Sequence, residues 1–133
     1  MAELNWSGIF PAVLTPFTVD GNIDYEMFAK NTEAQLSAGV HGIIVGGSLG
    51  DAAVLETNEK FELLKYAIDV VNGRIPVLIN IAENTTKKAI EFAVHAAEIG
   101  ANGFMLLPPM RYKADDREVV EYFKAVATAT DLP

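Results

Sequence analysis

The chain has 133 residues, half of them hydrophobic, and 18 acidic against 10 basic residues give it a formal charge of −8. Because this acidic balance repels a polyanion, nucleic acid is excluded as a partner. The sequence has no cysteine, which excludes disulfides and thiolate metal sites and fits a reducing compartment. No apolar run approaches the ~20 residues of a membrane span, and residues 1–6 lack the pattern of a signal peptide, so we expect no membrane contact and a cytoplasmic location.

Short apolar runs alternate along the chain with longer segments of helical period. The runs Ile9–Leu14, Gly42–Gly46, Pro76–Ile81 and Gly103–Leu107 are each bounded by glycine or proline. Each is too short for a helix, so the four runs are predicted strands.

Amphipathic helices are predicted between these runs and after the last one. Their ends are marked by side chains that cap helix N-termini and by glycines that follow helix C-termini. The predicted helices run from an Asp24 cap to Ser37, from just after Thr57 to near Gly73, from just after Asn84 or Thr85 to Gly100, and from Asp115 or Asp116 onward. In the third helix, the side chains predicted to face inward are Ile90, Ala93, Val94 and Ala97.

The strand and helix pairs recur at a spacing of roughly 30 residues, which is the size of a βα unit. Near-continuous apolar strands covered by helices indicate an α/β fold with a parallel sheet, and both an open doubly wound sheet and a (β/α)8 barrel fit this pattern. Residues 131–133 (DLP) repeat the arrangement of residues 74–76 (RIP) ahead of a strand. Four such units are half of a barrel of ~250 residues. We therefore expect residues 1–133 to form an N-terminal half-barrel of four βα units, with the remainder of the barrel absent from this chain.

A glycine-rich loop, Gly46–Asp51 (GGSLGD), follows the second predicted strand. Ligands of α/β folds bind at the carboxyl ends of strands, so this loop is a candidate binding site. A dinucleotide fingerprint would need a glycine at Val45, and a Walker loop would need a following Gly-Lys-Ser/Thr. What remains is a loop whose backbone amides and Ser48 hydroxyl suit a carboxylate or an oxyanion. The plain alternative is a tight turn that needs glycine for positive φ.

Three stretches together resemble the N-terminal half of the dihydrodipicolinate synthase and N-acetylneuraminate lyase superfamily. They are residues 15–17 (TPF), residues 20–24 (DGNID), and the glycine loop with Glu59-Lys60 after it, in which Asp51 replaces the family's glutamate. The resemblance spans essentially the whole chain. It implies the first half of a TIM barrel in which a lysine forms a Schiff base with pyruvate or another small 2-oxo acid. We expect no cofactor and no metal.

The resemblance also implies roles for individual residues. The family's two loop hydroxyls, which bind the substrate carboxylate and join a proton relay with tyrosines, fall on Ser48 and Leu49. Ser48 keeps the hydroxyl of a relay residue, whereas Leu49 offers only its amide, and Gly47 completes the substrate-binding loop. The family's tyrosine after the fourth strand aligns with Arg111, and Tyr112, one position on, is a further catalytic candidate. Arg111 would grip a distal substrate carboxylate or pair across a subunit interface.

No lysine lies within a predicted strand, where desolvation would depress the pKa of the amine. The nucleophile implied by the family therefore lies beyond Pro133, and the chain alone is expected to be inactive. The leading hypothesis is a Schiff-base lyase, homo-oligomeric (a dimer or tetramer) when complete. The alternatives are a pyrroline-hydroxy-carboxylate deaminase or a sugar-acid aldolase or dehydratase of the same superfamily and, from another class, a non-catalytic carboxylate-binding half-barrel.

Overall fold

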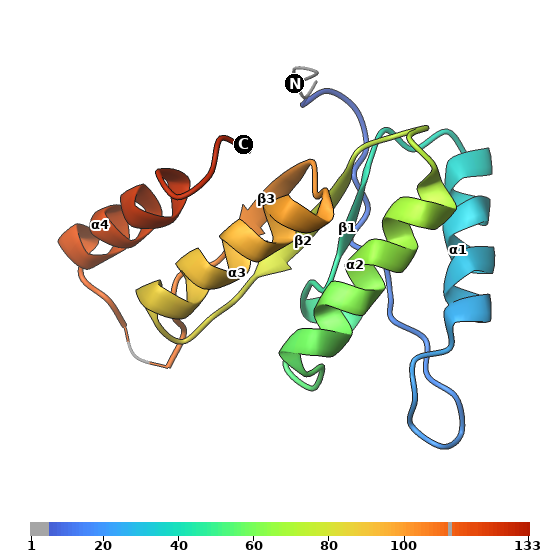
Figure 1. Ribbon diagram of the computed structural model, residues 1–133, viewed down its shortest axis with the longest axis horizontal. Coiled ribbons are helices and arrows are strands. Elements are labelled where there is room, and N and C mark those ends of the chain that lie inside the picture. Colours follow the sequence, from blue (N-terminus) through green and yellow to red (C-terminus); the bar gives the residue numbers. More distant parts are fainter. Residues whose placement is uncertain (1–5, 112) are drawn as a thin grey trace.

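The computed structural model describes residues 6–111 and 113–133 (Figure 1). These residues form a mixed α/β fold around a parallel sheet, as the apolar runs predict. The strands follow the order β1 (Ile43–Val45), β2 (Val77–Ile81) and β3 (Gly103–Leu106). Each strand pairs in parallel with the next, with Ile44 opposite Leu78 and Ile79 opposite Phe104.

The strand predicted over Ile9–Leu14 is wrong in extent, because only Ala12 forms a bridge, which is parallel and opposite Ile44. The segment still lies beside β1. Its Pro11 carbonyl accepts a hydrogen bond from the Ile44 N–H at 2.9 Å, and the Val13 N–H donates to the Ile44 carbonyl at 3.0 Å. Pro11 has no N–H to donate, which limits the ladder that this segment can form.

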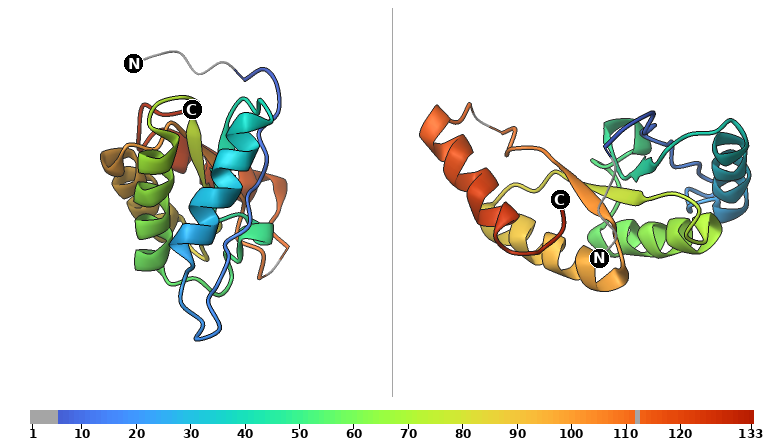
Figure 2. Two further views of the ribbon diagram at one scale, coloured as in Figure 1. Left: turned by 90° about the vertical axis from the view of Figure 1, so that its right-hand side faces the viewer. Right: turned by 90° about the horizontal axis from the view of Figure 1, so that it is seen from above.

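The helices are α1 (Tyr25–Ser37), α2 (Thr57–Val71), α3 (Thr86–Ile99) and α4 (Asp116–Ala127), with a short 3₁₀ turn, η1 (Ser48–Gly50), after β1. Viewed from above, the helices form an arc along one side of the curved sheet (Figure 2). None of the helices in the described part of the chain is long and apolar enough to cross a membrane.

The predicted helix starts are confirmed for three of these helices. The side chains of Asp24, Thr85 and Asp115 each accept a hydrogen bond from a backbone N–H of the first turn, as N-cap residues do. The prediction for α2 is off by one residue. Thr57 begins this helix, and Glu56 caps it through a reciprocal pair of hydrogen bonds with Glu59.

The core lies between the sheet and the helices. It includes Phe28 of α1, Leu64 of α2 and the β2 side chains that face the helices, Val77, Ile79 and Ile81. The buried face of α3 is rotated by about one residue from the predicted face. The buried residues are Ala89, Phe92, Ala93 and Ala96, whereas Val94 is 37% exposed. Phe92 sets this rotation because its ring packs on Phe61 of α2, with a centroid separation of 4.6 Å.

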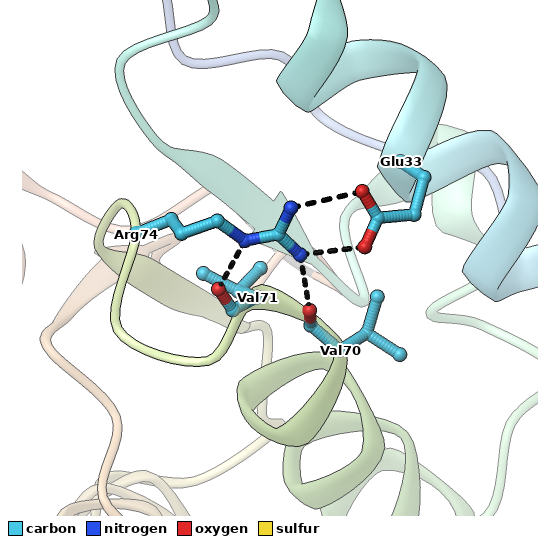
Figure 3. Close-up of polar contacts among 4 residues, drawn as sticks. All are labelled: Glu33, Val70, Val71 and Arg74. Atoms are coloured by element: carbon cyan, nitrogen blue, oxygen red, sulfur yellow. Dashed lines mark hydrogen bonds and ion pairs between the residues drawn. The ribbon is translucent and has the colours of Figure 1, made fainter.

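Arg74, in the turn between α2 and β2, connects α1 to the end of α2 (Figure 3). Its guanidinium donates to both carboxylate oxygens of Glu33, at 2.9 and 2.5 Å. It also donates to the carbonyls of Val71 and Val70, at 2.9 and 2.6 Å. These carbonyls belong to the last turn of α2 and have no partner within the helix, so Arg74 caps α2 while it pairs with α1.

The Glu33–Arg74 pair generates a pH-dependent prediction. The hydrogen bond from Arg74 lowers the pKa of Glu33 below its ordinary value of 4.5. The stabilisation is therefore fully present above that ordinary value and is lost as the pH falls through the lowered pKa. In the complete gene product, Glu33→Gln should lower the thermal midpoint at pH 7, and its difference from wild type should shrink as the pH falls toward about 3.

Glu62→Gln is the matched control, since among the described residues Glu62 forms an ion pair only with the exposed Lys65 of its own helix. This control should shift the midpoint little at pH 7, because exposed helix pairs contribute weakly. A Glu33→Gln difference that stays constant down to about pH 3 would show that the ion pair does not stabilise the fold.

Candidate functional site

The loops that follow the strands gather at one edge of the sheet. Because β1 and β3 run parallel within it, Gly46–Asp51 and the segment from Leu107 to Arg111 leave the sheet in the same direction, toward the lower end in Figure 1. The glycine loop and the segment after β3 therefore share one end of the sheet. This edge is where α/β folds bind their ligands.

The glycine loop is a tight turn with a defined backbone. Gly46 adopts a φ of +63°, in the left-handed region that favours glycine, and Asp51 closes the loop in the same region with a φ of 60°. Between them, the Gly47 carbonyl accepts hydrogen bonds from the N–H groups of Gly50, at 2.9 Å, and Ala52, at 3.2 Å. The interpretation of the loop as a tight turn that needs glycine for positive φ is thus correct for Gly46.

Thr15 fastens this loop to the segment beside β1. Its hydroxyl donates to the Gly50 carbonyl at 2.8 Å, and the side chain is only 4% exposed. A Cβ on Gly50 would stand 2.9 Å from the Val13 carbonyl oxygen, so only glycine permits this close approach. The sequence reasoning used Thr15 only as a family signature and missed this role. The signal that was available is a lone threonine at the end of an apolar run.

The remaining signature residues form a hairpin ahead of α1. Phe17 and Ile23 make an antiparallel bridge, and the Asp24 N–H donates to the Pro16 carbonyl at 2.8 Å. The Asp24 side chain then accepts from the Met27 N–H at 2.9 Å and starts α1. These residues therefore build a hairpin that leads into α1.

Three backbone amides of the loop are candidate donors to a ligand. Within residues 6–111 and 113–133, the N–H groups of Gly47, Ser48 and Leu49 have no backbone acceptor. The first N–H groups of a helical turn have no partner inside it. Ser48 is exposed and the Leu49 side chain is 68% exposed, so both residues of this turn face solvent. Such a cluster of amides can bind an anionic oxygen.

The segment after β3 carries the other predicted site residues. Arg111 is exposed, and none of the ion pairs in the described part of the chain involves it. Tyr112 lies outside the described residues. The buried Tyr122 of α4 holds the start of this segment, because its hydroxyl donates to the Leu107 carbonyl at 3.0 Å. Burial raises the pKa of Tyr122, and the negative charge of Glu83 raises it further.

Metal ligands and amine nucleophiles are not gathered at this edge in the described residues. No group of three or more His, Asp or Glu side chains there is placed to hold a metal ion. The strands β1, β2 and β3 contain no lysine. His41, at the opposite end of β1, has a structural role, since its Nδ1 accepts from the Ile9 N–H at 3.1 Å.

Comparisons with known proteins agree with this geometry. Residues 5–133 match the Dihydrodipicolinate synthetase family. A 4-hydroxy-tetrahydrodipicolinate synthase from Haloarcula marismortui is 35% identical over 133 residues, which are 100% of this chain and 43% of the relative. The crystal structure of a dihydrodipicolinate synthase from Bacillus anthracis superposes with a TM-score of 0.94 at 32% identity, covering 98% of this chain and 45% of that one.

A third similar protein was solved with a ligand. It is a prophage protein of the dihydrodipicolinic acid synthase family from E. coli K12, in complex with pyruvate. Its TM-score is 0.91 at 34% identity, over 96% of this chain and 43% of that one.

The parallel βα units and the loop at their carboxyl edge define an α/β protein that matches part of a TIM-barrel lyase. The extent of the sequence match fixes the family. The chain belongs to the Dihydrodipicolinate synthetase family and spans about 43% of the length of the relative from Haloarcula marismortui.

The Thr15 hydrogen bond can be tested in the complete gene product. Thr15→Val keeps the shape of the side chain but leaves the Gly50 carbonyl without its donor, so it should reduce the free energy of unfolding by about 1 to 3 kcal/mol. Thr15→Ser retains the hydroxyl and should recover most of this loss. Urea denaturation measures both variants, and a Thr15→Val variant as stable as wild type, with the loss confined to Thr15→Ser, would show that the methyl group of Thr15, rather than its hydroxyl, holds the loop.

Proposed function

We propose that this chain forms the carboxylate-binding half of a lyase that uses Schiff-base chemistry on pyruvate or another small 2-oxo acid. The observation that carries the proposal is the set of amides at Gly47, Ser48 and Leu49, which have no backbone acceptor among the described residues and lie at the carboxyl edge of the sheet. The pyruvate complex of a similar protein supports the ligand class. Under this proposal, residues 1–133 contribute the first four βα units of a barrel, and the active protein is a homo-oligomer.

The loop amides, Ser48, Leu49 and two residues after β3 each have a role in the proposed reaction. The amides would hold the substrate carboxylate, and the exposed Ser48 hydroxyl would relay protons. Leu49 would present an apolar side chain beside the carboxylate. Arg111 would contact a distal carboxylate, and Tyr112 would donate a further proton.

Imine formation supplies the driving force of the proposed chemistry. A protonated imine at the former carbonyl carbon accepts electrons from a neighbouring carbon, so a bond at that carbon can form or break. This step needs a primary amine in a desolvated position. Because β1, β2 and β3 carry no lysine, the proposal places that amine outside residues 1–133.

Two alternative functions share the same loop. Residues 47–50 (GSLG), together with the Pro-x-x-Tyr-Lys pattern of residues 109–113, resemble family members that act on hydroxyproline-derived or sugar-derived 2-oxo acids, which would make the protein a pyrroline-hydroxy-carboxylate deaminase or a sugar-acid aldolase or dehydratase. A non-catalytic carboxylate-binding protein would retain the amides and lack the amine. Imine trapping separates this last possibility from the enzymes.

Borohydride reduction with pyruvate tests the proposed chemistry. The complete gene product should form one stoichiometric adduct, located by mass spectrometry on a lysine outside residues 1–133. Residues 1–133 made alone should form none and, in light scattering, should self-associate through their open strand edges. An adduct on a lysine within this chain would contradict the assignment, and the absence of any adduct would favour the non-catalytic alternative.

Substitutions in the loop test the residue roles. In the complete gene product, Leu49→Thr should strengthen pyruvate binding by about 0.5 to 1.5 kcal/mol, if one net hydrogen bond is gained. Calorimetry measures this change, and unchanged or weaker binding would remove the loop from the carboxylate site. Ser48→Ala should instead lower kcat with little change in affinity, and unchanged turnover would exclude a proton relay through Ser48.

A further inference from the structure

Asn80 is an unusual residue within β2. The other four residues of this strand are apolar, and Asn80 is only 2% exposed. Neither its amide nitrogen nor its amide oxygen has a hydrogen-bond partner in the described residues. Buried amides in native proteins are almost always paired, so this group calls for a partner that the ligand-free chain does not supply.

The orientation of β2 places this amide on the side away from the helices. Val77, Ile79 and Ile81 pack into the core beneath the helices. Because side chains alternate along a strand, Leu78 and Asn80 project from the opposite, concave face. The unpaired amide therefore lies on the face that the arc of helices leaves uncovered (Figure 2).

The strand register brings Asn80 to the layer directly under the glycine loop. Asn80 pairs with Met105 of β3, so their side chains stand side by side on the concave face. Gly46 is the next position on that face after Ile44 of β1. The Met105 Cε lies 3.6 Å from where a Cβ on Gly47 would stand, so this layer adjoins the candidate carboxylate site.

We propose that Asn80 is a specificity-determining residue that binds a hydroxyl group of the substrate beneath the glycine loop. A carboxylate or carbonyl oxygen would satisfy only the amide nitrogen and would leave the amide oxygen unpaired. A hydroxyl both donates and accepts, so it satisfies both ends of the carboxamide. The substrate class is therefore a hydroxylated 2-oxo acid.

Access to the amide requires one movement. Both polar atoms of Asn80 are sealed from solvent in the ligand-free chain. Met105 is the half-buried neighbour on the same face, and its unbranched thioether has three rotatable bonds. Under this proposal, rotation of the Met105 side chain would open a path to the amide without a change in the backbone. This inference rests on the proposed function, because it assumes that a 2-oxo acid occupies the site.

The test compares two ligands that differ by one hydroxyl, 2-oxobutanoate and 4-hydroxy-2-oxobutanoate. Their affinities for the complete gene product are measured by calorimetry, with wild type compared to Asn80→Leu. The wild type should bind the hydroxylated acid more tightly than 2-oxobutanoate. In the variant, the ratio of these two affinities should fall about tenfold, while the affinity for 2-oxobutanoate stays the same. An unchanged preference in the variant overturns the inference.

Thermal stability separates a ligand role from a structural one. Asn80→Leu removes an unpaired buried amide, so it should raise the thermal midpoint of the ligand-free protein. A lower midpoint would show that Asn80 is hydrogen-bonded to another part of the complete protein, which overturns the inference. Thr32→Val is the matched control, since Thr32 is the other buried side chain without a partner in the described residues and lies on α1. It should raise the midpoint and leave the ligand preference unchanged.

Imine trapping with pyruvate tests the proposed function independently of the role of Asn80. A pyruvate adduct together with an unaltered ligand preference in Asn80→Leu overturns the role of Asn80 alone. If pyruvate and both four-carbon acids give no adduct and no binding, the proposed function and this inference fail together.

Discussion

Parallel pairing on both sides of Ile44 is the constraint on which the rest of the structure depends. Ile44 bridges Ala12 on one side and pairs with Leu78 on the other. Parallel neighbours cannot be joined by a tight turn, so each connection crosses back through a helix, and all carboxyl ends collect at one edge. The position of the glycine loop therefore follows from the hydrogen bonding of the sheet. The loop's conformation is then fixed locally, by the Thr15 hydroxyl and by the close approach that Gly50 allows.

The sequence was most informative where a local interaction decides the structure. Asp24, Thr85 and Asp115 cap their helices because the capping oxygen and its N–H partner lie within a few residues of each other. The two errors in the helices have different causes. The start of α2 was displaced by one residue because Glu56 and Glu59, which are close in sequence, cap each other. The face of α3 was wrong because a distant contact decides it, the packing of Phe92 on Phe61 of α2. The spacing of hydrophobic residues indicates that a helix has a buried face, but it does not determine which residue lies at the centre of that face.

Some residues of the candidate site could be predicted from the sequence, and others could not. The glycine loop was recognisable because six residues of unusual composition follow a strand, and the strand's direction places them at the binding edge. Thr15 and Asn80 were missed because their roles depend on burial. A threonine at the end of an apolar run and an asparagine inside one are ordinary in sequence. They become informative only when the fold removes both from water, since a polar group buried without a partner is costly.

The last residues of the chain lie along the outer edge of β3. The Phe104 N–H donates to the Pro133 carbonyl at 2.9 Å, as the Ile43 N–H donates to the Pro76 carbonyl at 3.1 Å just ahead of β2. A mostly apolar groove of about 420 Å³ lies beside this edge, between β3 and α4. The candidate amide donors for the substrate carboxylate lie on the wall formed by β1 and its loop, and β1, β2 and β3 carry no lysine. In the proposed reaction, a substrate held by its carboxylate on this wall would turn its carbonyl carbon across the concave face, toward an amine supplied from the opposite side.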